Sequence, residues 1–135
     1  MGEWNKIFIT PQKFHDDIIK LCNMIPKDKY NYVCGVPRGG VIIAIYVSHY
    51  CNITFSEYEE IDYIDSNETI LIVDDLTDTG KTLKEFQNNE QFETAVLYYK
   101  PRSIIKPTYF VEHSDNDQWI VFPYEKPDEE PNREI

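Results

Sequence analysis

Residues 70–83 read ILIVDDLTDTGKTL, an apolar run followed by a polar turn. Four large apolar residues in succession are typical of a strand buried in a parallel sheet. Two adjacent carboxylates, Asp74 and Asp75, end this run, and a third, Asp78, precedes a glycine-containing turn. The stretch therefore predicts a buried strand that delivers three carboxylates to one edge of a sheet.

The rest of the chain alternates apolar strands with amphipathic or apolar helices. The strand of the opening motif is expected at residues 69–73. Further strands are expected at residues 5–9, 31–36, 53–58, 94–99 and 109–111, with an edge strand at 119–122. Helices are expected at residues 11–25, 41–50 and 80–88. This alternation predicts one α/β domain with a twisted, mainly parallel sheet flanked by helices. We expect the domain to span residues 1–125, followed by an acidic, mobile tail at 126–135.

Composition narrows the classes of function. The 135 residues carry a net charge of -11, which argues against a broad basic face for nucleic acid. No apolar stretch approaches the roughly 20 residues of a membrane span. The N-terminus lacks the features of a signal peptide, so we expect a cytoplasmic protein. The three cysteines and three histidines show no spacing typical of metal ligands.

The turn after residue 77 suits an anionic ligand. The sequence GKT also ends the phosphate-binding loop of nucleoside triphosphatases, but that loop needs glycine where Asp75 stands. An acidic turn can simply cap the next helix, yet three carboxylates before TGKT favour a ligand site. Gly80 and the flanking threonines at a helix N-terminus would suit a phosphate. Asp74 and Asp75 would then hold sugar hydroxyls or magnesium.

A second loop, PRGG at residues 37–40, follows the strand expected at 31–36. Ligands of parallel α/β sheets bind beyond the carboxyl ends of the strands. If the two strands are neighbours in the sheet, the PRGG loop and the 74–82 loop face a common cleft.

The segment VDDLTDTGKTL at residues 73–83 resembles the phosphoribosyl-pyrophosphate (PRPP) motif of the type I phosphoribosyltransferases. PRGG at 37–40 is similar to that family's pyrophosphate loop. Tyr99-Lys100-Pro101, Trp119 and Ile120 have similar counterparts, in order, in the bacterial xanthine-guanine branch. The resemblance implies the type I phosphoribosyltransferase fold with a small hood. It also implies an enzyme of purine salvage, a pentosyltransferase that converts PRPP and a 6-oxopurine (guanine, xanthine or hypoxanthine) to a nucleoside 5′-monophosphate and pyrophosphate.

The same resemblance implies roles for individual residues. Asp78, as general base at N7 of the purine, and Arg38 would be catalytic. PRPP would be bound by Asp74, Asp75, Asp78, Thr79, Gly80, Lys81, Thr82, Arg38, Gly39 and Gly40. Magnesium would be the cofactor, held by Asp75 and Asp74. The family also implies a cis peptide bond between Pro37 and Arg38.

The purine would be recognised by Lys100, Trp119 and Ile120. Lys100 would donate to the 6-oxo group, Trp119 would stack on the base, and the backbone of Ile120 would read the 2-substituent. From the residues alone, an exposed lysine at a strand end is the preferred interpretation of Lys100. Trp119 equally suits core packing.

One feature departs from the family pattern. Only residues 59–68 (EEIDYIDSNE) connect two of the expected strands, which shortens the flexible loop that closes over the site in the family. A non-catalytic PRPP- or nucleotide-binding protein, or a phosphoribosyltransferase for another base, therefore stays open as an alternative. By analogy with the family we expect a homodimer or homotetramer.

Overall fold

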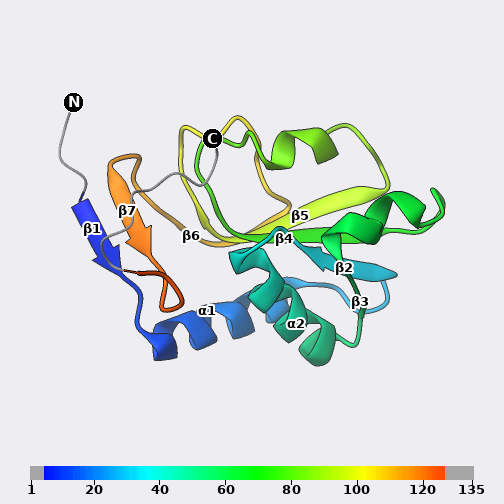
Figure 1. The fold of residues 1–135 in the computed structure, drawn as a ribbon, viewed down its shortest axis with the longest axis horizontal. Helices are drawn as coiled ribbons and strands as arrows, with labels where there is room; N and C mark the ends of the chain where they lie inside the picture. The colour runs from blue at the N-terminus through cyan, green and yellow to red at the C-terminus, as the bar shows by residue number, and fades with distance from the viewer. Residues whose placement is uncertain (1–4, 127–135) are drawn as a thin grey trace.

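The computed structural model describes residues 5–126, and it has an α/β architecture (Figure 1). Five parallel strands form the main sheet in the order β3-β2-β4-β5-β6. Their bounds are β2 Tyr32–Gly35, β3 Thr54–Ser56, β4 Ile70–Thr77, β5 Phe92–Tyr99 and β6 Tyr109–His113. The predicted fold class is therefore confirmed, and β4, the strand of the opening motif, lies at the centre of the sheet.

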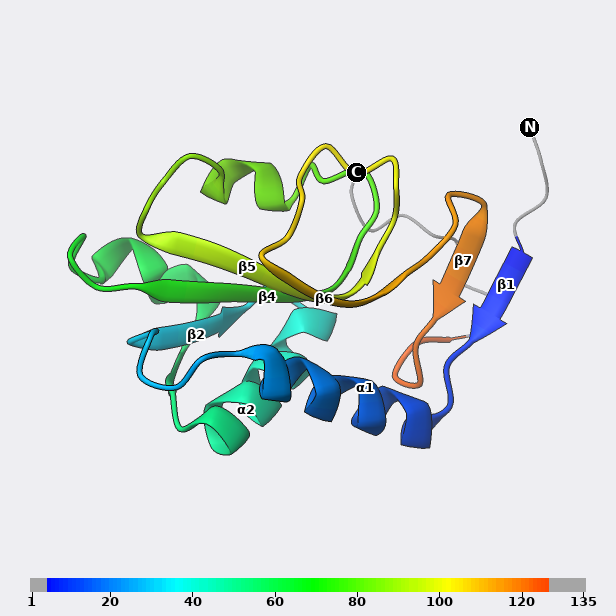
Figure 2. The ribbon, with the colours of Figure 1, turned by 180° about the vertical axis from the view of Figure 1, so that it is seen from behind.

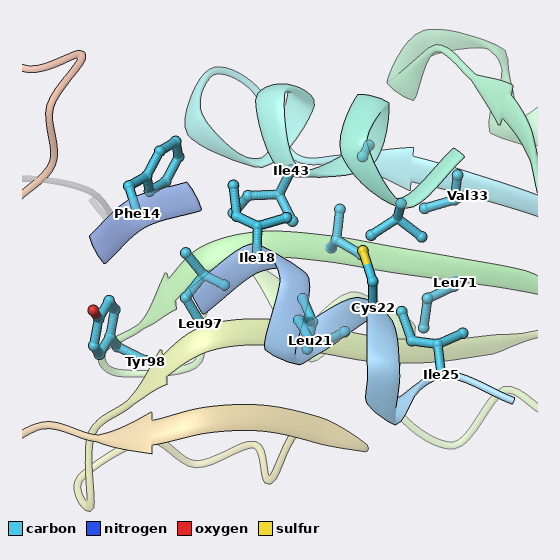
Figure 3. Close-up of a cluster of buried hydrophobic side chains, with 14 of the residues drawn as sticks. Phe14, Ile18, Leu21, Cys22, Ile25, Val33, Ile43, Leu71, Leu97 and Tyr98 are labelled. Carbon is cyan, nitrogen blue, oxygen red and sulfur yellow. The ribbon is translucent and has the colours of Figure 1, made fainter. Parts of the chain in front are cut away.

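Two α-helices, α1 (Pro11–Met24) and α2 (Gly39–Cys51), cover one face of this sheet (Figures 1 and 2). α1 begins as the sequence predicts, because the Thr10 hydroxyl accepts a hydrogen bond from the Lys13 amide at 3.0 Å and Pro11 occupies the first turn. Its apolar side packs on the sheet together with α2. The cluster includes Phe14, Ile18, Leu21, Cys22, Ile25, Val33, Ile43, Leu71, Leu97 and Tyr98 (Figure 3).

The opposite face of the sheet has a thinner cover. Two short 3-10 helices, Tyr58–Tyr63 and Leu83–Phe86, lie over it. They contribute Ile61, Leu83 and Phe86 to a second buried cluster with residues of β2, β4 and β5. Both faces of the sheet are therefore covered. This explains why the central strands are continuous apolar runs and do not alternate between apolar and polar residues.

Two predicted elements are wrong. The helix expected at 80–88 is only the 3-10 helix Leu83–Phe86. The chain leaves it at Gln87 in an extended conformation, and Asn88 then adopts a left-handed φ of 61°. Asn88 and Asn89 offer polar side chains suited to a turn, which overrides the helical pattern before it.

The strand at the end of the domain is not an edge strand of the main sheet. β7 (Gln118–Val121) pairs in parallel with β1 (Asn5–Phe8) in a separate two-stranded sheet, with Lys6 opposite Trp119. Figure 2 shows this pair beside the main sheet, beyond the start of α1. It is the small hood that the family resemblance implied. Within the described part of the chain, no helix has the length and apolarity to span a membrane.

Candidate active site

The two predicted loops leave adjacent strands at the same edge of the sheet. β2 and β4 pair directly, and the Val36 amide continues their pairing by donating to the Val73 carbonyl at 2.9 Å. A Cβ on Gly40 would lie 2.4 Å from that Val73 carbonyl oxygen. The start of α2 can therefore approach β4 this closely only because residue 40 is glycine. The expectation that both loops meet at one place is confirmed.

The PRGG loop turns from β2 into α2 within four residues. Its Pro37–Arg38 peptide bond is cis, as the resemblance implied. Gly39 is the first residue of α2, and the Gly40 amide donates to the Val36 carbonyl at 2.9 Å. Arg38 is exposed at the head of this turn. The loop thus presents a guanidinium and a tightly folded backbone at the strand edge.

The adjacent carboxylates Asp74 and Asp75 lie within β4, not after it. Successive strand residues point to opposite faces of a sheet, so the two side chains diverge. Asp74 is half-buried, and its Oδ1 accepts from the Asp75 amide at 2.8 Å. Asp75 is only 3% exposed, and its Oδ2 accepts a hydrogen bond from the hydroxyl of Tyr124. Sequence reasoning missed Tyr124, although it lies five residues after Trp119.

Asp74 and Asp75 could supply oxygen ligands to magnesium, but they do not form a complete metal site by themselves. Among residues 5–126, no group of three or more histidine, cysteine, aspartate or glutamate side chains gathers at a metal-binding distance. Magnesium in nucleotide and phosphate sites is usually held by one or two carboxylates, with the remaining ligands from water and substrate phosphates. Asp74 and Asp75 supply oxygen donors of this kind, so a cation would need the substrate to complete its shell.

The turn at residues 78–82 is held by the segment that follows β5. The Ile104 amide donates to the Thr79 carbonyl at 2.8 Å, and Gly80 has φ 90°. A Cβ on Gly80 would lie 2.9 Å from both the Ile105 amide nitrogen and the Ser103 hydroxyl. Glycine is required at residue 80 because of this positive φ and because a side chain would collide with these two atoms.

Part of the phosphate prediction for this turn is wrong. It placed the phosphate at the N-terminus of an α-helix, and the structure has only the four-residue 3-10 helix Leu83–Phe86 after this turn. What the turn offers a phosphate is its backbone amides and the hydroxyls of Thr79 and Thr82. The Thr79 hydroxyl also lies 3.4 Å from the Lys81 amide, which donates to it.

Asp78 lies at the centre of an ion cluster between β4, β5 and the hood. The Nζ of Lys100 lies 3.8 Å from Oδ2 of Asp78, and the Nε of Arg102 lies 2.5 Å from Oδ1. Lys100 is 2% exposed and donates to the carbonyls of Asn116 and Gln118, the former at 3.3 Å. Lys100 is therefore not an exposed strand-end lysine. Arg102, only two residues after Lys100, was not predicted.

Trp119 and Ile120 lie in the hood strand β7. Trp119 is 9% exposed, and Lys6 lies over its ring with Nζ 4.4 Å from the ring centroid. The Ile120 side chain is buried in the main core, and its backbone pairs with Ile7 of β1. Lys100 joins this strand to Asp78 through the Gln118 carbonyl.

The short connection between β3 and β4 packs on the second face of the sheet. Tyr58 contacts Phe86 edge-on with ring centroids 6.3 Å apart, and it donates to Glu85 at 3.3 Å. Burial, followed by the negative charge of Glu85, raises the pKa of Tyr58 to about 12. Ile61 of the same 3-10 helix is buried. The connection is therefore a packed segment and does not extend as a long loop.

No family profile matches the chain. The xanthine-guanine phosphoribosyltransferase of Idiomarina loihiensis is 27% identical over 140 residues, covering 89% of this chain and 87% of that protein. The crystal structure of a purine phosphoribosyltransferase from Pyrococcus horikoshii has a TM-score of 0.78 and 28% identity, covering 90% of this chain and 95% of that one. The resemblance to the type I phosphoribosyltransferases is confirmed. The predicted enzyme class, a phosphoribosyltransferase and hence a pentosyltransferase, is confirmed with it.

More distant phosphoribosyltransferase structures share the fold. The xanthine-guanine-hypoxanthine phosphoribosyltransferase of Helicobacter pylori has a TM-score of 0.74 at 20% identity, covering 89% of this chain and 92% of that chain. The high coverage in both directions shows that the phosphoribosyltransferase fold accounts for most of this chain.

Proposed function

We propose that the chain transfers the phosphoribosyl group of PRPP to a 6-oxopurine, forming a nucleoside 5′-monophosphate and pyrophosphate with magnesium as cofactor. The observation that carries this proposal is the convergence of Asp78, Lys100 and the hood strand β7. A carboxylate, a buried ammonium and an aromatic strand come together from three separate elements. That combination suits a planar ligand with a proton to transfer and a carbonyl to bind.

In the proposed reaction, the purine lies between the cluster and the hood. Lys100 donates to the 6-oxo group, a contact that adenine, with an amino group at that position, cannot offer. Asp78 holds the proton at N7 as the bond to the ribose forms. Trp119 stacks on the base, and the Ile120 backbone reads its 2-substituent.

The other end of the site would hold PRPP. The 78–82 turn binds the 5′-phosphate through amides and through the hydroxyls of Thr79 and Thr82, with Lys81 adding charge. Asp74 and Asp75 hold the ribose hydroxyls. Arg38 and the backbone of Gly39 and Gly40 stabilise the departing pyrophosphate, which carries the developing negative charge. Magnesium, when bound near Asp75 and Asp74, would supply charge neutralisation for the same leaving group.

The test uses the purified chain with PRPP and, separately, guanine, xanthine, hypoxanthine, adenine and uracil. We expect pyrophosphate release with 6-oxopurines only, and loss of release when magnesium is chelated with EDTA and restored by added magnesium. Turnover with adenine or uracil in place of 6-oxopurines would contradict the proposed base class. Turnover that resists chelation would contradict the proposed cofactor.

A second candidate function is a non-catalytic binder of PRPP or nucleotide. The observation that favours it is the packed connection between β3 and β4, since a long closing loop is the usual means of excluding water during the reaction. Calorimetric binding of PRPP without turnover of any base would support this binder. The Asp78–Lys100 pairing favours the enzyme, because a binder needs no group to hold the proton.

We further propose that the protein acts in the cytoplasm as a homodimer or homotetramer. The reaction needs only small molecules, namely PRPP and a purine base, and its product is a nucleoside monophosphate. The phosphoribosyltransferase domain is proposed at residues 1–125. Of the tail proposed at 126–135, all but Lys126 lies outside the described residues. Light scattering of the purified chain would give the number of subunits.

A further inference from the structure

Tyr124 follows the hood strand and reaches back to the centre of the site. Its hydroxyl donates to Oδ2 of Asp75, a carboxylate that is 3% exposed. The bond joins a segment near the end of the described chain to the central strand β4. Nothing in the proposed reaction assigned this tyrosine a role.

The position of the Tyr124 ring is fixed by two aromatic neighbours. Phe122 stacks on it with an interplanar angle of 4° and centroids 5.6 Å apart, and Phe14 of α1 meets it edge-on at 5.7 Å. The backbone around Tyr124 is also fixed, because Phe122 and Glu125 on either side of it form a hydrogen-bonded turn. The Glu125 amide donates to the Phe122 carbonyl, and the Glu125 carboxylate accepts from the Phe122 amide, both at 2.9 Å. A hydroxyl held in this way has little freedom to leave Asp75.

The hydroxyl and carboxylate also lie against the pyrophosphate loop. A Cβ on Gly39 would lie 2.0 Å from the Tyr124 hydroxyl oxygen and 2.2 Å from Oδ2 of Asp75. The pair therefore occupies the volume that any side chain at residue 39 would need. Through this contact, Tyr124 sets where the carboxylate lies relative to the first turn of α2.

We propose that Tyr124 is a positioning residue for Asp75. Its hydroxyl fixes the rotation of this carboxylate toward the magnesium-PRPP end of the site. The inference rests on the proposed function, because it assumes that Asp75 meets PRPP and its metal. Hydrogen-bond partners of metal-binding carboxylates set the orientation of those ligands, and their loss typically weakens metal affinity or activity about 10- to 100-fold.

The variant Tyr124→Phe removes the hydroxyl and keeps the ring between Phe14 and Phe122. Tyr63→Phe is the matched control, because Tyr63 is 84% exposed and lies away from these contacts. We expect Tyr124→Phe to raise the KM for PRPP about 10-fold and to leave the KM for guanine unchanged. In calorimetry without guanine, the magnesium concentration needed for half-maximal PRPP binding should rise by a similar factor. Tyr63→Phe should change none of these values.

Measurements on the wild-type chain distinguish failure of the proposed function from failure of the inference about Tyr124. If it neither turns over a purine nor binds PRPP, the proposed function is wrong and this inference falls with it. If it does either, and Tyr124→Phe matches Tyr63→Phe in magnesium-dependent PRPP binding, only the inference is overturned. Tighter PRPP binding by Tyr124→Phe would also overturn it, because the hydroxyl would then compete with the ligand. Thermal melts of all three proteins check that each is folded.

Discussion

The guanidinium of Arg102 lies with Nε 2.5 Å from Oδ1 of Asp78, so the carboxylate proposed to hold the purine proton already has a cationic partner. The Arg102 amide is itself held by the Asn116 side chain at 3.0 Å. This second bond ties the position of the guanidinium to the loop that leads into the hood. Arg102 thus links the turn after β4 to the part of the site proposed to hold the purine.

Arg102→Ala should lower kcat/KM for the 6-oxopurine about tenfold, because Asp78 loses the partner that orients it. A charge-assisted hydrogen bond is worth about 1.5–3 kcal/mol, and solvent screening of this 40% exposed side chain brings the effect toward the lower end. Lys106→Ala removes an exposed cation from the same segment and should have little effect. Steady-state kinetics on both variants checks the prediction. Equal losses in the two variants would assign the effect to net charge.

Lys100→Met should raise the KM for guanine more than tenfold while the KM for PRPP stays within about twofold. Methionine has a similar length but cannot donate to a 6-oxo group. The carbonyls of Asn116 and Gln118 also lose their donor, so the melting temperature should fall as well. Kinetics with each substrate varied in turn separates these effects. If the two KM values rise together, Lys100 supports the whole site and does not select the base.

Much of this site could be predicted because its residues are adjacent in sequence. The strand that ends in Asp74 and Asp75, the turn around Gly80 and the PRGG loop each form a continuous motif. That β2 and β4 pair could only be expected conditionally, since strand order depends on the whole chain. The structure supplies it directly.

The unpredicted partners are those that long-range packing brings in. Tyr124 is 49 residues from Asp75 in sequence, and Arg102 is 24 from Asp78. No local periodicity connects such pairs. The helix predicted at 80–88 is wrong for a local reason and not because of long-range packing. Its apolar spacing is real, and Leu83 and Phe86 are buried, but the asparagines that follow end it after one turn.

The ionised carboxylate of Glu93 stabilises the folded protein, and this stabilisation is lost in acid. Burial alone would raise its pKa, but hydrogen bonds from Tyr30 and Lys29 lower it below the ordinary 4.5. A lowered folded-state pKa stabilises the protein above the unfolded-state pKa, and this stability is lost as the pH falls through the folded-state value. Wild type should therefore melt above Glu93→Gln at pH 7, and the gap should narrow below about pH 4.5. Melting curves from pH 7 to pH 3 would show it.

Glu90→Gln is the control for this comparison, since Glu90 is an exposed carboxylate in the preceding turn. Its melting temperature should follow that of wild type across the range. A gap for Glu93→Gln that stays constant with pH would mean that the substitution acts through packing. In that case the hydrogen bond from Tyr30 would not be the source of the stability.

Gly40→Ala tests whether the close approach of the two loops is required. The new Cβ would lie 2.4 Å from the Val73 carbonyl oxygen and 3.1 Å from the Asp74 Cα, both backbone atoms of a central strand that cannot move aside alone. Forced overpacking of this kind typically costs about 1–3 kcal/mol. The start of α2 must therefore move away from β4, which separates the PRGG loop from the carboxylates. We expect a lower melting temperature together with an increased KM for PRPP.

Val41→Ala, at the next position of α2, is the control. It removes atoms instead of adding them and measures the cost of merely altering the helix. If Gly40→Ala binds PRPP as tightly as Val41→Ala does, the spacing between the two loops does not matter for PRPP.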